Sequence, residues 1–75
     1  MIEKFEARQK TSRGGAAKCV LEVVRHVGQI HVYSTDRQHI TRQVAAYTFG
    51  EWLNLDYRDM TLHQAGITSY TPSHS

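Results

Sequence analysis

The sequence has a single cysteine, a single proline and no long run of apolar residues. One cysteine, Cys19, cannot form an internal disulfide, whereas secreted domains of this size usually carry several. The amino-terminal stretch MIEKFEARQK is charged from its third residue, unlike a signal peptide. No stretch approaches the roughly 18 apolar residues that span a bilayer. We therefore expect a small soluble, cytoplasmic protein with no membrane partner.

The chain also lacks a strong excess of either charge. Nine lysines and arginines face seven acidic residues, for a net charge of +2. This excess is too small to imply a polyanionic partner by itself. A length of 75 residues allows one domain with a small core, and 40% hydrophobic residues are ordinary for a globular domain.

Motifs for catalysis are missing as well. The sequence contains no nucleophile elbow and no phosphate-binding glycine loop, and no pair of carboxylates stands out. Cys19 falls among apolar residues of a predicted strand, where a free cysteine acts as a small core residue. We therefore expect a non-enzymatic protein without a cofactor.

Residues 16–34, AAKCVLEVVRHVGQIHVYS, are rich in β-branched and aromatic side chains, which favours a β-hairpin. Reading Gly28-Gln29 as a two-residue type II′ turn pairs His26 with His31. Alternation along the two strands then predicts one buried face, formed by Cys19, Leu21, Val23, Val27, Ile30 and Val32. Arg25 falls on the same side and is expected at its rim. A helix over about 15–27 is the alternative, since its alanines and valines recur at helical spacing. Its four valines disfavour it.

The opposite face of this hairpin is the predicted partner-binding site. It carries Val24, His26, His31 and Tyr33, a mixture of apolar, aromatic and imidazole groups typical of protein interfaces. Two facing histidines can also share a metal ion, but a zinc site needs three or four ligands. We therefore assign no metal ligand, and a small metal-binding protein is our third interpretation.

The segment 34–49 carries signals of a helix start. Thr35 and Gln38 have the spacing of a capping box, and Asp36 places negative charge in the first turn. Apolar side chains recur at helical spacing, and Gly50 is a natural helix terminator. We predict one main helix over about 36–49, packed against the hairpin.

The remaining segments are less patterned. Residues 2–10 suit an edge strand or a short helix, and 11–15 form a glycine loop. We expect 51–57 to be extended and 58–66 to form one or two helical turns. The prediction is a small single α+β domain over 1–66, with a β-hairpin or three-stranded meander against one main helix, followed by a flexible polar tail over 67–75.

The favoured function is that of a small accessory or regulatory module that binds another protein through the polar face of its hairpin. The alternative is a nucleic-acid-binding module, because Lys10, Arg13 and Lys18 surround the glycine loop within residues 8–18. An exposed strand edge could also pair with a second copy of the chain to make a homodimer.

Overall fold

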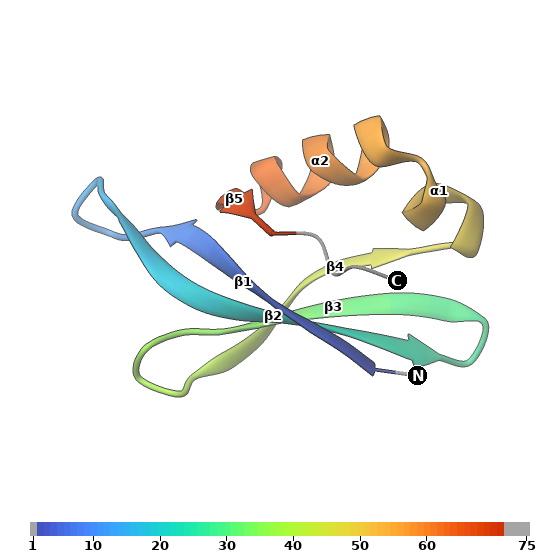
Figure 1. The fold of residues 1–75 in the computed structure, drawn as a ribbon, viewed down its shortest axis with the longest axis horizontal. Helices are drawn as coiled ribbons and strands as arrows, with labels where there is room; N and C mark the ends of the chain where they lie inside the picture. The colour runs from blue at the N-terminus through green and yellow to red at the C-terminus, as the bar shows by residue number, and fades with distance from the viewer. Residues whose placement is uncertain (1, 72–75) are drawn as a thin grey trace.

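The computed structural model describes residues 2–71. The elements follow in the order β1 (Ile2–Lys10), β2 (Ala16–His26), β3 (Gln29–Thr35), β4 (Thr41–Tyr47), α1 (Phe49–Leu53), α2 (Leu55–Gln64) and β5 (Ile67–Tyr70) (Figure 1). The strands form one antiparallel sheet in the order β4-β3-β2-β1-β5. The predicted α+β class is confirmed, but the sheet has five strands rather than two or three.

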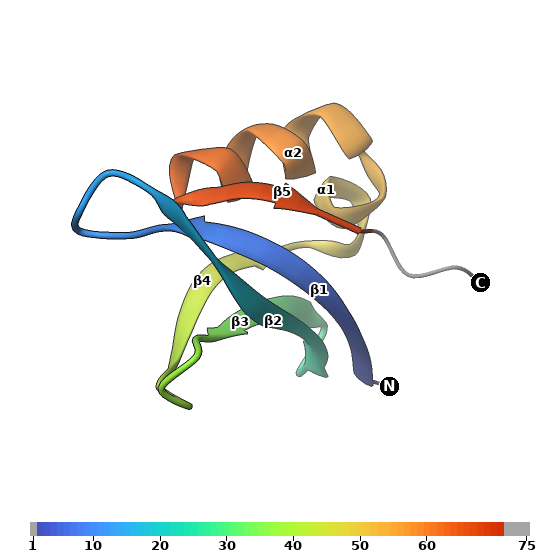
Figure 2. The same ribbon diagram turned by 60° about the vertical axis from the view of Figure 1, so that its left-hand side comes forward.

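Both helices lie over the same face of the strongly curved sheet (Figures 1 and 2). The core fills the space between the helices and the sheet: Leu21 of β2, Val32 of β3 and Leu62 of α2 are each 0% exposed. One polar side chain is buried there, since Ser34 is 1% exposed and its hydroxyl donates to Gln9 Oε1 at 2.7 Å. Within residues 2–71, no helix covers the other face of the sheet.

The β2–β3 hairpin exists, and the helix considered for residues 15–27 is excluded. Its turn, however, is Val27-Gly28 rather than Gly28-Gln29, with φ of 45° and 78° as a type I′ turn requires. His26 therefore pairs with Gln29, and His31 pairs with Val24. The predicted pairing is wrong by two positions, and a shift of two leaves each side chain that remains in a strand on its expected face.

The buried face of the hairpin is accordingly confirmed at five of its six predicted positions: Cys19, Leu21, Val23, Ile30 and Val32. The prediction for Val27 is wrong, because this residue occupies the turn and is 89% exposed. Arg25 lies at the rim as predicted, with its guanidinium carbon 4.7 Å from the centroid of the Phe49 ring.

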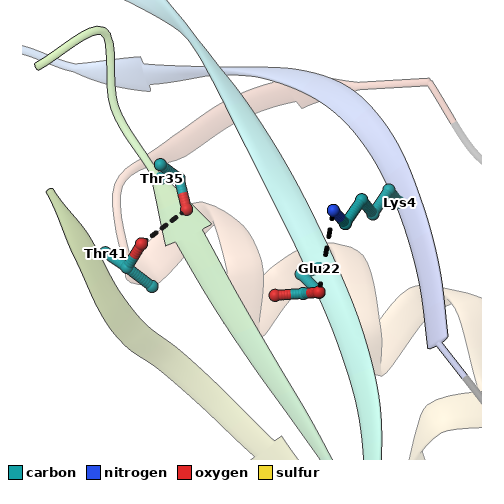
Figure 3. Close-up of polar contacts among 4 residues, drawn as sticks. All are labelled: Lys4, Glu22, Thr35 and Thr41. Carbon is teal, nitrogen blue, oxygen red and sulfur yellow. Dashed lines mark hydrogen bonds and ion pairs between the residues drawn. The ribbon is translucent and has the colours of Figure 1, made fainter. Parts of the chain in front are cut away.

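The predicted main helix over 36–49 is wrong, since this segment holds a tight loop and strand β4. Asp36 Oδ1 accepts hydrogen bonds from the amides of Gln38 at 2.8 Å and Ile40 at 3.0 Å, which closes the loop. The hydroxyls of Thr35 and Thr41 then meet across β3 and β4 at 2.7 Å (Figure 3). The acidic residue that suggested a helix start therefore organises a turn.

The helices begin later than predicted, and the extended segment expected over 51–57 is wrong. Thr48 caps α1 through a capping box with Glu51, so Gly50 lies inside this helix instead of ending it. Asn54 caps α2 by accepting from the amide of Tyr57 at 3.1 Å. The helical turns predicted within 58–66 are confirmed, as part of the longer α2.

The last described strand, β5, lies beside the first strand, β1. The tail predicted over 67–75 is wrong for Ile67–Tyr70, because β5 pairs with β1 and Ile67 is only 2% exposed. The strand interpretation of residues 2–10 is correct, but β1 lies inside the sheet rather than at its edge. Residues 72–75 of the predicted tail lie outside the described residues. Neither α1 nor α2 is long and apolar enough to cross a bilayer.

Candidate functional site

The sheet has one face opposite the helices, the open face. Every second side chain of the strands lies on it. The register places on it Lys4, Glu6, Arg8, Lys10, Lys18, Val20, Glu22, Val24, His26, Gln29, His31, Tyr33, Thr35, Thr41, Gln43 and Ala46. Val20 is 42% exposed in the middle of this face. The open face therefore combines apolar, aromatic and charged groups on one surface that no helix of the described chain covers.

All four predicted partner-binding residues come together on the open face. The rings of His26 and His31 stack with centroids 4.7 Å apart, and the Tyr33 ring lies 6.4 Å from His31. Val24 is the register partner of His31 across β2 and β3. His31 Nε2 lies 3.0 Å from Gln29 Oε1, within hydrogen-bond distance. The result is a compact cluster of rings beside an aliphatic side chain.

The two stacked histidines do not extend to a metal centre. Across residues 2–71, no three histidine, cysteine, aspartate or glutamate side chains converge as metal ligands. Cys19 points to the opposite face of the sheet and is 4% exposed. Because a structural zinc site needs four ligands, the donor set present here does not fit one.

The predicted basic cluster is partly assembled. Lys10 and Lys18 share the open face, and the register sets Arg8 directly opposite Lys18, while Arg13 lies in the β1–β2 loop. Arg8 was not among the predicted site residues, although its place two residues before Lys10 puts both on one face. Arg8 Nη2 donates to the carbonyl of Ala16 at 3.0 Å.

Acidic side chains interrupt this positive charge on the open face. Glu6 neighbours Arg8 along β1. Glu22 lies 4.0 Å from the ammonium of Lys4, measured from Oε2 to Nζ (Figure 3). The open face is therefore of mixed charge rather than a continuous basic surface.

A groove of about 710 Å³ between α2 and β5 was not predicted from the sequence. Its helix wall includes the exposed apolar side chains Leu55 and Met60, and β5 lines the other side. The Tyr70 hydroxyl donates to the Asp59 carboxylate, which ties β5 to α2. Finding this groove requires knowing that residues 67–70 form a strand beside the helix.

A smaller cleft of about 260 Å³ lies under α1. Its walls are mostly apolar, and it is lined by Glu3, Val23, Arg25, Ile30, Phe49, Trp52 and Leu53. Leu53 is 77% exposed at its rim. Arg25 and Ile30, which line this cleft, flank the hairpin turn that holds the exposed Val27.

Two tyrosines have shifted acidities, and both serve the packing of the helices. Burial raises the pKa of Tyr47, whose hydroxyl donates to Thr61 Oγ1 at 2.5 Å while Thr61 donates to the Tyr57 carbonyl. Burial and the Asp59 carboxylate raise the pKa of Tyr70. Both tyrosine hydroxyls stay protonated at neutral pH and form hydrogen bonds that join the sheet to α2.

Comparison with known proteins identifies no family. The chain matches no protein-family model, no curated protein sequence and no solved structure.

Proposed function

We propose that this chain is a small cytoplasmic accessory or regulatory module, not an enzyme, that binds another protein through its open face. The observation that carries the proposal is the cluster of Val24, His26, His31 and Tyr33 on a sheet face that no helix within residues 2–71 covers. Its mechanism would be to occlude or bridge surfaces of the partner.

The composition of the open face favours a protein partner over a polyanion. Protein interfaces combine apolar and aromatic anchors with a polar rim. Here the ring cluster and Val20 supply the anchors, and Lys4 and Glu22 are among the charged groups of both signs around them. A polyanion would meet Glu6 and Glu22 on the same surface, and both would repel it.

The test compares capture from a cytoplasmic extract by the wild-type chain and by a His31→Ala/Tyr33→Ala variant. A protein captured by the wild type is then purified and its affinity is measured for both chains. Loss of two ring anchors is expected to weaken binding at least about tenfold. A Phe49→Ala variant is the matched control, because it removes an exposed ring of α1 that lies off the open face. Equal affinity of all three chains would overturn the proposal.

Nucleic-acid binding is the second candidate, and one observation favours it. Arg8 and Lys18 face each other across β1 and β2, with Lys10 and Arg13 close by. Like charges directly opposite each other destabilise a sheet, unless an anion compensates them. Phosphate binding must weaken steeply as salt is raised. Retained binding by a Lys10→Glu/Arg13→Glu/Lys18→Glu variant would exclude this candidate.

A homodimer through a strand edge is compatible with either candidate. β4 and β5 are the two ends of the sheet, and either edge could pair with a second copy. Sedimentation equilibrium over a range of chain concentrations would show the oligomeric state.

A further inference from the structure

We propose that the groove between α2 and β5 binds an extended acidic peptide of a partner protein, which adds to the sheet as a further strand next to β5. This surface is separate from the open-face ring cluster. The proposal therefore concerns a second interaction, with a partner recognised through its backbone.

The backbone of β5 offers the hydrogen bonds for such a strand. β5 stands at one end of the sheet, and within residues 2–71 no strand pairs with its outer edge. The Thr71 amide donates to the Glu6 carbonyl at 3.0 Å, on the β1 side. Because successive residues of an antiparallel strand point their amides to opposite edges, the N–H and C=O of Tyr70 are directed outward. An extended backbone laid beside β5 can pair with these groups, as in other cases of strand addition.

Two hollows adjoin β5, one toward α2 and one over its junction with β1 and β2. The groove of about 710 Å³ lies toward α2, where Leu55 is 59% exposed and Met60 is 49% exposed. A second hollow of about 290 Å³ lies on the other side of β5, against β1, and Ser69 lines both. Side chains of an added strand alternate between the two faces of the sheet, and those on one face point toward α2. Those facing α2 would pack on Leu55 and Met60.

The groove is held in shape before any peptide arrives. The hydrogen bond from Tyr70 to Asp59 joins β5 to the middle of α2. The Arg58 guanidinium carbon lies 4.3 Å from the centroid of the Trp52 ring, and this contact holds the Arg58 side chain of α2 against α1. A preorganised groove lowers the entropy cost of ordering the complex.

Charge selects the class of peptide. Arg58 and His63 line the helix side of β5, and Arg8 and Lys18 line the hollow on its other side. The acidic groups there are Glu6, which neighbours Arg8 along β1, and Asp59, which accepts from Tyr70. The two hollows together hold Arg8, Lys18 and Arg58 against Glu6 and Asp59, and this excess of positive charge favours a strand with acidic side chains, because oppositely charged surfaces attract during encounter.

The experiment is an amide NMR titration of the full chain with three blocked hexapeptides. The first alternates glutamate and valine, the second alternates lysine and valine, and the third is the glutamate peptide with alternate backbone nitrogens methylated. The glutamate peptide is expected to shift the amides of Thr68–Tyr70 and α2 in a saturable way. Methylation, which replaces backbone N–H donors with methyl groups, and the lysine peptide should each weaken binding at least about tenfold.

Two exposed apolar positions provide matched variants. Met60→Glu lies in the groove and is expected to weaken glutamate-peptide binding at least about tenfold, while Leu53→Glu on α1 leaves it unchanged. Both side chains are exposed, so both variants should keep the wild-type amide spectrum elsewhere.

Several outcomes would overturn the proposal. These are the absence of saturable shifts with the glutamate peptide, equal binding of the methylated peptide, equal effects of the two variants, or pairing of β5 with a second copy instead of the peptide. Shifts confined to His26, His31 and Tyr33 would also overturn it. Unchanged peptide binding by His31→Ala/Tyr33→Ala would separate this result from the test of the open face.

Discussion

The imidazole rings of His26 and His31 stack with their centroids 4.7 Å apart, although the strand register pairs neither residue with the other. They are diagonal neighbours across β2 and β3, a relation that long or flat side chains can span. His31 continues the contact toward Tyr33 at 6.4 Å. The two histidines therefore contribute to an aromatic surface on the open face rather than to a facing pair of metal ligands.

The turn residue Val27 should be a site of stabilising substitution. Its φ of 45° is unfavourable for a β-branched residue, and its side chain is 89% exposed, so little packing offsets the strain. Val27→Asn creates the Asn-Gly pair that type I′ turns prefer. We expect the free energy of unfolding in urea to rise by about 1 kcal/mol. Val20→Asn, an exposed valine within β2, is the control and should not stabilise the chain.

The packing of α2 on the sheet should depend on Leu62. This side chain is 0% exposed in the core, whereas Leu55 on the same helix is 59% exposed. Leu62→Ala is expected to lower the free energy of unfolding by about 2–5 kcal/mol, because it leaves a cavity. Leu55→Ala should change it by less than about 0.5 kcal/mol. Similar losses from both substitutions would show that α2 is not packed as described.

The loop between β3 and β4 should depend on the oxygen of Asp36. Its Oδ1 accepts from the amides of Gln38 and Ile40 at 2.8 and 3.0 Å. Asp36→Ala removes both bonds and should cost about 1–2 kcal/mol of unfolding free energy. Asp36→Asn keeps an acceptor oxygen and should retain most of the stability. Urea denaturation of the three chains measures the difference, and equal stability of the alanine variant would contradict the role of this loop.

Stability should fall at high pH because of Tyr47. Burial raises the pKa of Tyr47 in the folded chain above its usual value of 10.0. As the pH rises from that value toward the folded pKa, the unfolded chain releases this proton and the folded chain keeps it, so unfolding becomes more favourable. Tyr47→Phe is expected to be about 1 kcal/mol less stable at neutral pH, through loss of the bond to Thr61, and to show a smaller decline above pH 10. Urea denaturation at a series of pH values would show whether the two declines differ.

The hairpin could be predicted from residues 16–34 because its signals are local. Alternation assigned Leu21, Val23 and Val32 to the buried face even though the turn was placed one residue late. A register error of two positions preserves the face of each side chain that stays in a strand, so Val24, His26, His31 and Tyr33 share one face as predicted.

The errors arose where one local pattern fits two structures. Asp36, which lies between Thr35 and Gln38, suits the first turn of a helix and also a loop closed by the aspartate side chain. Pairing of β4 with β3 decided between them. At Gly50 the sequence did hold a signal for the true helix, since Thr48 and Glu51 have the spacing of a capping box.

From the sequence alone, one could determine which apolar side chains of β2 and β3 are buried, because the period of a strand is a property of neighbouring residues. Only the tertiary structure decided which sheet face is left uncovered and where a groove forms. Those features depend on contacts between distant segments, such as Ala7 of β1 with Tyr70 of β5. No local pattern in the nearby sequence encodes such a contact.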